Sequence, residues 1–449
     1  MVFSSIPFLF FFLPIFLMVY YILPFKNISL MIFSLIFYAW GEPIYILLML
    51  FSSIVDFTIG KLIEKKENKK IYLIMSIVIN LMLLGFFKYS DFIIININNL
   101  FNLNINTLNL GLPIGISFFT FQTMSYSIDV YRGNVKACKK FFNFLTYVSM
   151  FPQLIAGPIV RYEEVDKELE KREITFNNFN SGLIRFLNGL FKKVLIANYL
   201  GKLFEILTVN VNDSSMIGVW VGIISFSMQI YFDFSGYSDM AIGIGKMLGF
   251  TYPENFNYPF ISKSITEFWR RWHISLSSWF KDYLYIPLGG NRHNQVRNIL
   301  IVWLCTGLWH GASWNFILWG LYFGILLLLE KYVFKNILEK IPNIFRHIVT
   351  IFLVVISFYI FAFDDMNKLI GFGKVMFGLS DNPVINIETI FNIKEYIFIL
   401  ILGLIFSTPI LKERVKINWI TISIYVILFI LVVALLVSNT YNPFLYFRF

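Results

Sequence analysis

The sequence predicts an all-α protein that crosses a membrane many times, and three observations lead to that prediction. Hydrophobic residues fill 57% of the 449 positions and charged residues only 14%, whereas a soluble domain averages about 25% charged residues. The mean hydropathy is +0.70. Apolar stretches of bilayer-spanning length alternate with short basic loops. We therefore expect one membrane-embedded domain over residues 1–449, with about ten or more spans of roughly 20 residues each.

The net charge of +10 comes from basic residues in the loops between apolar stretches. This distribution follows the positive-inside rule and is unlike a nucleic-acid-binding surface, so we expect membrane lipids and no nucleic acid as partners. Cys138 lies in a basic loop and Cys305 in an apolar stretch, which indicates two free thiols. The first apolar stretch, 6–23, has no basic segment before it and no cleavage site, so we interpret it as a span.

Basic loops orient the N-terminal third. Residues 61–70 (KLIEKKENKK) and 132–140 (RGNVKACKK) are basic, whereas 90–111 contains no Lys or Arg. The positive-inside rule places the first and third of these segments in the cytoplasm and the second outside. Five spans fit this orientation and put the N-terminus outside: 6–23, 28–40, 44–59, 71–87 and 112–130.

The middle of the chain is less regular. Residues 151–162 (FPQLIAGPIVRY) are apolar but broken by Pro and Gly, and such backbone survives at membrane depth only inside protein or beside a water-filled cavity. An amphipathic stretch, 182–203, precedes a full span at 217–234. That span leads into Asp233 and Asp239, two acids among aromatic residues, which we interpret as the mouth of a cavity.

A basic, aromatic segment follows at 264–290. Ser264 and Glu267 form a capping box at its start. An apolar stripe at helical spacing continues from there: Phe268, Trp272, Leu276, Trp279 and Tyr283. The pattern predicts one helix along, or dipping into, the cytoplasmic face.

The C-terminal third alternates again. Residues 331–346 are basic and cytoplasmic, the acids at 364–365 lie outside, and 412–416 (KERVK) is basic and cytoplasmic. The last span, 417–437, therefore delivers the tail NTYNPFLYFRF to the outer face.

His310 stands in a stretch, 298–329, that contains no Asp, Glu, Lys or Arg. Twelve residues of helix after the cytoplasmic Arg297 rise about 18 Å, which places His310 near or beyond the bilayer midplane. Because Lys331 is cytoplasmic again, the segment predicts a helical hairpin with its turn at Gly311. Such a turn must lie inside the protein, since its backbone groups would go unpaired in lipid.

An imidazole in that place suits proton transfer, because it titrates near neutrality. Trp309, Trp314 and Asn315 surround His310 in the sequence, as expected for a site. The alternative is a structural histidine that bonds a neighbouring helix. His273, which follows two arginines, is the second candidate, with a solvated interfacial histidine as its alternative.

We expect His293 and His347, both in basic loops, to be solvated. The sequence contains no His-x-x-x-His pair, and no Cys stands close enough to a His to suggest zinc, so no metal site is expected. Phosphate-loop, GxSxG and GxGxxG motifs are also missing from it.

Four long segments now point to a family. They are 151–162, 229–249 (QIYFDFSGYSDMAIGIGKMLG), 256–298 (beginning FNYPFISKSITEFWRRWHISLSSW) and 307–320 (GLWHGASWNFILWG). These segments resemble the membrane-bound O-acyltransferase superfamily, and within it the bacterial branch of alginate, peptidoglycan and cellulose O-acetyltransferases. The resemblance implies a ring of about 11 to 13 tilted transmembrane and re-entrant helices around a thinned centre. It also implies a catalytic core within 252–330, with a cytoplasmic funnel for an acyl thioester.

The resemblance assigns roles to individual residues. It makes His310 the catalytic histidine and His273 the second histidine of the family. It implies acetyl-CoA as the acyl donor, with no permanently bound cofactor. A basic and aromatic cluster would then hold the phosphates of the donor: Trp269, Arg270, Arg271, Lys281 and Arg292. The alternative for each basic member is a solvated position on the cytoplasmic face.

The segment 417–449 gains a role in the same way. Its end, NPFLYFRF, resembles the C-terminal motif of a small partner protein in teichoic-acid D-alanylation, which implies that Tyr446 relays the acyl group. The alternative is an aromatic anchor at the membrane rim. The resemblance further implies a bacterial cytoplasmic-membrane protein that acetylates an extracytoplasmic glycan through a secreted or anchored, SGNH/esterase-like partner.

A rival function is a transporter or exporter of polysaccharide precursors in which the histidine relays protons. Such a protein should show an internal repeat with broken helices in matching positions. No repeat is visible in the sequence, which favours the acyltransferase.

Overall fold

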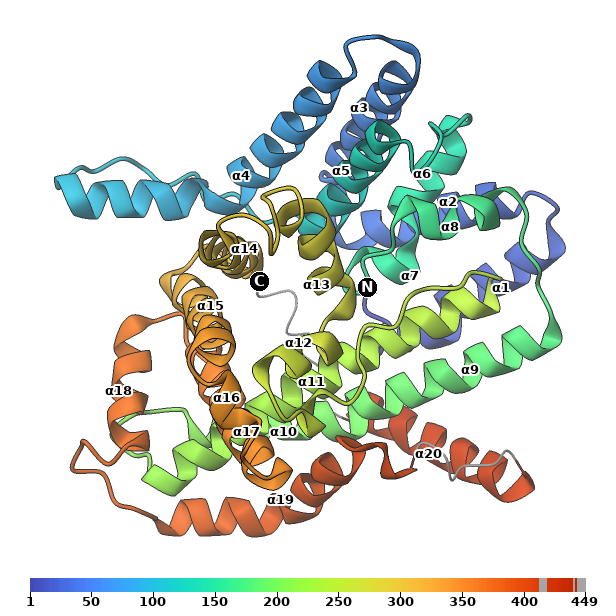
Figure 1. Ribbon diagram of the computed structural model, residues 1–449. Coiled ribbons are helices and arrows are strands. Elements are labelled where there is room, and N and C mark those ends of the chain that lie inside the picture. The colour runs from blue at the N-terminus through green and yellow to red at the C-terminus, as the bar shows by residue number, and fades with distance from the viewer. Residues whose placement is uncertain (412–417, 439–440, 442–449) are drawn as a thin grey trace. The chain divides into compact units, whose positions relative to one another are not determined.

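The computed structural model describes residues 1–411, 418–438 and 441, and their regular secondary structure is entirely helical (Figure 1). The predicted all-α polytopic class is confirmed. Within the described residues, seven helices are long and apolar enough to cross a membrane: 46–65, 69–101, 216–247, 314–332, 343–362, 387–406 and 419–438. The ring of about 11 to 13 transmembrane and re-entrant helices stays a prediction.

The chain divides into two compact units, which we describe separately. Unit 1 comprises 1–186 and 237–253, and unit 2 comprises 187–236 and 254–449. Two helices contribute residues to both units: α9 (Phe176–Phe191) and α11 (Met216–Met247). The prediction of a single domain over residues 1–449 stays a prediction.

Unit 1 is built on an aromatic core. Its remaining helices are η1 (Phe8–Phe12), α1 (Leu13–Ile22), α2 (Lys26–Gly41), α3 (Ile46–Lys65), α4 (Lys69–Phe101), α5 (Ile116–Arg132), α6 (Phe141–Ser149), α7 (Phe151–Leu154) and α8 (Tyr162–Glu170). Phe151, from the Pro- and Gly-broken segment, is fully buried. Its ring lies 5.1–5.4 Å from the rings of Phe12, Phe16 and Phe37. The broken segment is therefore enclosed in protein, as expected.

A polar network joins three helices of unit 1. The fully buried Asp56 carboxylate on α3 accepts hydrogen bonds from Ser76 (2.5 Å) and Asn80 (2.7 Å) on α4 and from Ser127 (2.9 Å) on α5. Hydrogen bonds of this kind stabilise the packing of membrane helices, because the hydrophobic effect does not favour contact with another helix over contact with lipid. Helix α4 itself continues to Phe101, whereas the sequence predicted a span that ends near 87; it ends where Asn102 is left-handed (φ +53°).

Unit 2 contains two of the segments singled out from the sequence, 256–298 and 307–320. Its helices are η2 (Lys192–Ala197), α10 (Asn198–Leu207), η3 (Pro259–Ile261), α12 (Ile265–Arg271), α13 (Ile274–Phe280), η4 (Lys281–Tyr285), α14 (Gln295–His310), α15 (Trp314–Tyr332), α16 (Lys335–Leu338), α17 (Asn343–Ala362), α18 (Met366–Met376), α19 (Ile387–Phe406), η5 (Pro409–Leu411) and α20 (Trp419–Ser438). The expected amphipathic stretch 182–203 is covered by α9, the π-helical η2 and α10.

The predicted hairpin is present as α14 and α15, which lie side by side in Figure 1. Glycines permit the close approach of its two arms. A Cβ on Gly307 would collide with the carbonyl oxygen of Phe316, and one on Gly320 with the carbonyl oxygen of Trp303. Small residues at such contacts are the usual means of packing membrane helices closely.

The prediction of one helix through the stripe 268–283 is wrong. The chain forms α12, breaks, and resumes as α13 and η4. His273 is left-handed (φ +43°) at the break. The preceding loop replaces the lost helical hydrogen bonds, because the Asn255 carbonyl accepts from Ile274 N–H and Asn257 N–H donates to the Arg271 carbonyl, each at 2.9 Å. The predicted cap is present, with the Ser264 hydroxyl accepting from Glu267 N–H at 3.0 Å.

Candidate functional site

His310 is the last residue of α14 and is 7% exposed. Three aromatic rings enclose its imidazole: Trp309 at 5.1 Å, Trp319 at 4.9 Å and Phe361 at 5.2 Å between centroids, all roughly perpendicular. The histidine therefore lies inside unit 2 and away from lipid, as its place at the hairpin turn required.

Asn315 helps to fix the position of this aromatic wall. It is fully buried near the start of α15, and its side-chain amide donates to the carbonyl oxygens of Phe361 (3.3 Å) and Ile360 (3.4 Å) on α17. The contact joins α15 to the end of α17, where Phe361 packs against His310. Asn315, noted in the sequence only as a neighbour of His310, thus acts on the site through Phe361.

His273 is 1% exposed, so it is not a solvated interfacial histidine. Its Nδ1 lies 3.0 Å from the side-chain oxygen of Asn255. The same oxygen accepts from the Ser275 hydroxyl (2.9 Å) and the Ser275 N–H (3.3 Å). Because an amide oxygen only accepts, Nδ1 carries the proton and Nε2 of the neutral ring keeps its lone pair.

The structure brings the two histidines together in unit 2. The Trp309 ring, which touches His310, also lies 5.8 Å from the His273 ring. Phe234 packs edge-on against His273 at 4.6 Å. Burial, and then the charge of His310, lowers the pKa of His273, which lies outside the seven candidate spans, well below its ordinary value. This shift favours the neutral ring of His273, which is the form that can accept a proton or a hydrogen bond.

Trp269 lies beside this pair and is 8% exposed. Its ring contacts Trp303 at 4.5 Å and Trp319 at 5.6 Å, and Trp319 in turn contacts His310. The indole Nε1 atoms of Trp269 and Trp319 are buried, and neither has a hydrogen-bond partner among the described residues. Two indole donors thus remain available close to the histidines.

The four basic members of the predicted cluster differ in their exposure to solvent. Arg270, Lys281 and Arg292 are exposed. Arg271 is half-buried, where it forms an ion pair with Glu267 at 2.9 Å and donates to the Asn257 carbonyl at 3.1 Å. Arg271 is therefore engaged within the protein, whereas the other three guanidinium and ammonium groups face outward.

The two acids interpreted as a cavity mouth are both paired. Asp233 forms a buried ion pair with Lys193 at 2.7 Å in unit 2. Asp239 forms an ion pair with the half-buried Arg185 at 2.7 Å in unit 1. The pairing accounts for carboxylates in apolar surroundings without an aqueous mouth. No feature of the sequence indicates which base pairs with Asp233 or with Asp239, whose partner Arg185 lies 54 positions away.

Three further predictions concern surface or terminal residues. His293 is exposed, as expected. The expectation for His347 is wrong, because it is half-buried and its Nδ1 lies 3.0 Å from the Ser262 carbonyl oxygen, a bond between residues 85 positions apart. Tyr446 and the loop 412–416 lie outside the described residues, whereas Tyr441 of the same tail is described.

The fold and the site define a polytopic α-helical membrane protein with two buried imidazoles in an aromatic enclosure. Comparison with known proteins assigns this class to a family. The sequence model of MBOAT, the membrane-bound O-acyltransferase family, matches residues 139–368, which include both histidines. The chain belongs to this family, and it is an acyltransferase.

Individual relatives agree with the assignment. A probable alginate O-acetylase of Pseudomonas aeruginosa is 42% identical over 84% of this chain and 75% of its own length. Its counterpart in Pseudomonas putida is 36% identical over the whole of both chains. The peptidoglycan O-acetyltransferase of Helicobacter pylori is 36% identical over 85% of this chain and 80% of its own.

Proposed function

We propose that this protein takes acetyl from acetyl-CoA at the cytoplasmic face of a bacterial cytoplasmic membrane and passes it outward for O-acetylation of an extracytoplasmic glycan. The observation that carries the proposal is the buried pair of His310 and His273 in unit 2. The names of the similar proteins, which act on alginate or peptidoglycan, support the acetyl group and the class of acceptor. The final transfer would use a separate secreted or anchored esterase-like protein.

His310 would act as the general base. It removes the proton from the attacking hydroxyl while that oxygen forms a bond to the thioester carbonyl carbon. The carbon–sulfur bond then breaks, and the proton passes to the thiolate of the departing coenzyme A. Nδ1 of His273 is held by Asn255, so its Nε2 can accept a hydrogen bond from a group beside His310.

The donor would approach from the basic side. Arg270, Lys281 and Arg292 are exposed and carry the positive charge that suits the phosphates of coenzyme A. Short basic loops mark the cytoplasmic side under the positive-inside rule, which also puts the N-terminus and the C-terminal tail outside. Donor and acceptor would thus meet the histidines from opposite sides of the membrane.

The first acceptor hydroxyl would be the Tyr446 phenol. A phenol is a poor nucleophile until a base removes its proton, and His310 can supply that base. An aryl ester is a reactive acyl donor, so acetyl-Tyr446 could hand the group on to a hydroxyl of the partner. The net result is one thioester consumed and one glycan ester formed for each acetyl group.

The test uses three variants of the full-length protein in its own cell. His310→Ala should abolish acetylation of the surface glycan, whereas His293→Ala, which changes an exposed histidine, should leave it intact. Tyr446→Phe keeps the ring and removes the oxygen, so acetylation should stop. Mass spectrometry of wild-type protein should find part of the C-terminal peptide heavier by one acetyl group. Normal acetyl content in His310→Ala would overturn the proposed role of the histidine, and normal content in Tyr446→Phe the relay.

A further inference from the structure

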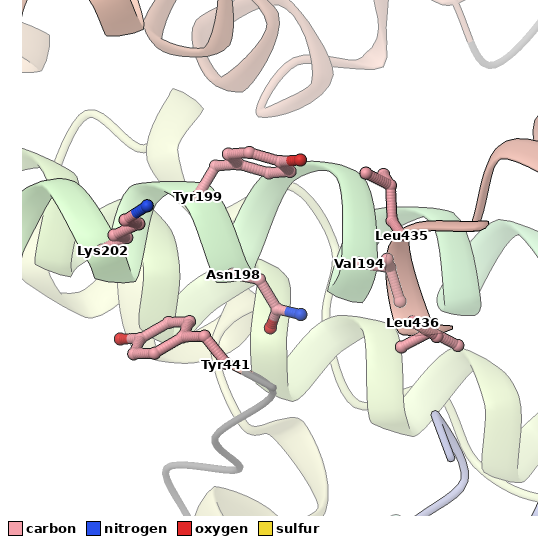
Figure 2. A pocket seen from close by; sticks show the side chains of 7 residues that line it. All are labelled: Val194, Asn198, Tyr199, Lys202, Leu435, Leu436 and Tyr441. Carbon is pink, nitrogen blue, oxygen red and sulfur yellow. The ribbon is translucent and has the colours of Figure 1, made fainter. Parts of the chain in front are cut away.

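The pocket between η2, α10 and the end of α20 in unit 2 is small (Figure 2). Tyr441 forms one of its walls. The pocket leaves about 50 Å³, which is room for a few water molecules and too little for a sugar or a nucleotide. It is therefore not a substrate site, whereas unit 1 exposes an apolar surface along α4.

Helix α4 is longer than a bilayer is thick. Its 33 residues extend over about 50 Å, whereas the hydrocarbon core is about 30 Å thick and is crossed by about 20 residues. The helix begins with Lys69 and Lys70, two exposed charged side chains that stay in water. The residues after about position 90 therefore lie at or beyond the opposite surface of the bilayer. We call residues 91–111, the last turns of α4 and the loop after them, the α4 arm.

Helix α4 bends near the point where it leaves the bilayer. Figure 1 shows its last turns leaving the direction of its first turns and extending away from the other helices of unit 1. Two residues near the bend weaken the regular helix: Gly85 has no side chain, and the Ser90 hydroxyl donates to the carbonyl oxygen of Phe86. A bent helix can lie along the surface of the bilayer, which a straight helix would leave.

The α4 arm has a polar face, and its own loop covers that face. The Asp91 carboxylate accepts hydrogen bonds from the N–H groups of Leu108 (2.7 Å) and Asn109 (3.0 Å). The Asn98 side chain accepts from Ile105 N–H (3.0 Å) and donates to the Ile105 carbonyl (2.8 Å). These four bonds fold the loop back on the helix, and they engage the one charged side chain of the arm.

The apolar face of the arm continues the lipid-facing side of the span. Residues at steps of four and seven positions share one face of a helix. Five such residues of α4 are 45–74% exposed: Val78, Met82, Phe86, Ile93 and Leu100. The first three belong to the part that crosses the bilayer, where lipid covers exposed apolar side chains. Because the same face runs on into the arm, the surface that covers the first three also suits the last two.

We propose that the α4 arm is an interfacial segment, whose apolar face, with Ile93 and Leu100, lies in the surface of the bilayer. Interfacial helices bury such a face about 5–10 Å into the boundary between headgroups and acyl chains. The arm contains no Lys, Arg or Glu, so burial of apolar side chains supplies the binding, without attraction to anionic lipids. Under the orientation proposed above this is the outer leaflet, but neither the contact nor its test depends on that orientation or on acetyl transfer.

The contact is tested with Anap, a fluorescent amino acid, introduced at one position at a time in the full-length protein in liposomes. In place of Leu100, its fluorescence should be quenched by bromine atoms on the lipid acyl chains and not by iodide in the water. In place of Asn99, which is exposed and points away from this face, the order should be reversed. Equal quenching by iodide at the two positions would overturn the proposal.

The lipid charge supplies a second test. The quenching pattern at Leu100 should be the same in phosphatidylcholine and phosphatidylglycerol vesicles, and at low and high salt, because the arm carries no basic residue. Protection that appears only with anionic lipid would overturn the apolar basis of the contact. A protein partner on this face, including a second copy of the chain, would shield Leu100 from both quenchers. Shielding of that kind, lost when the protein is diluted in lipid, would also overturn the proposal.

A variant measures what the apolar face contributes. Leu100→Asn, with Anap in place of the neighbouring Phe101, should raise the quenching by iodide severalfold, since the arm loses an apolar side chain that enters the bilayer. The unfolding temperature in detergent should not change, because the Leu100 side chain is 74% exposed and contacts little of the protein. Unchanged quenching by iodide in this variant would show that the apolar face does not hold the arm, and would overturn the proposal.

Discussion

Replacement of Asn255 by leucine removes the oxygen that orients His273, and we expect the variant to lose most of its acyl transfer. Leucine is similar to asparagine in size but accepts no hydrogen bond. The substitution removes the acceptor that three hydrogen-bond donors share: Nδ1 of His273, and the N–H and hydroxyl of Ser275. The backbone bond from Ile274 to the carbonyl of residue 255 is retained, so the loop keeps its path.

The magnitude follows from these contacts. A buried donor left without an acceptor costs about 1–3 kcal/mol. The Ser275 N–H contact is long at 3.3 Å, and the Ser275 hydroxyl can rotate toward another acceptor, so the His273 contact at 3.0 Å counts most. We expect the free energy of unfolding to fall by about 2–4 kcal/mol. Without its acceptor, the Nδ1–H tautomer of His273 loses about 1.4 kcal/mol of preference, which corresponds to about a tenfold loss of transfer.

Two measurements check this expectation: the acetyl content of the surface glycan per molecule of enzyme in the membrane, and thermal unfolding in detergent. Asn255→Asp is the matched control, because it keeps the acceptor and adds a negative charge that favours the protonated imidazole. Its activity should persist at high pH and decline as the pH falls, since a protonated ring accepts no further hydrogen bond. Wild-type transfer by Asn255→Leu at all pH values would refute the role of this contact.

Two other predictions concern the helices that hold the site. Gly307→Ala should destabilise the protein by about 1–3 kcal/mol or more, because its Cβ meets the backbone of Phe316; Gly85→Ala, where a Cβ meets nothing within 4 Å, should not lower the unfolding temperature in detergent. Lys193→Met should cost about 3–5 kcal/mol by leaving Asp233 buried without its partner. The double variant with Asp233→Leu should recover most of that loss, and equal unfolding temperatures for the single and double variants would contradict the explanation.

The hairpin around His310 was predictable because its signals are local. A stretch without charges, a basic residue at each end and a glycine in the middle fix the length of both arms and the place of the turn. The observed helices end and begin at His310 and Trp314, as that argument requires. The family resemblance added the chemistry, which no periodicity could supply.

The partners of the site residues were not predictable in the same way. Asn255 belongs to a loop without periodic structure, 18 residues before His273. Asp233 on α11 forms an ion pair with Lys193 on η2. Nothing in the sequence indicates which acidic residue pairs with which basic residue. The side-chain contacts of Phe361 and Asn315 depend on how α15 packs against α17. Each of these contacts joins residues that are far apart in the sequence, and many other residues of the same type could have formed it.

The helix that the sequence predicted through 268–283 breaks at a residue of the site, His273. The apolar stripe favours a continuous helix, and a left-handed histidine costs about 1–3 kcal/mol relative to a helical one. Such a conformation persists only where the surroundings fix it, and here the Asn255 and Asn257 backbones replace the lost helical bonds. In a continuous helix, Nδ1 of His273 would lose the position from which it reaches the Asn255 side chain. The break therefore orients the His273 ring between Phe234 and Trp309, with its proton on Nδ1. The geometry of the site is thus obtained at the expense of local helix stability.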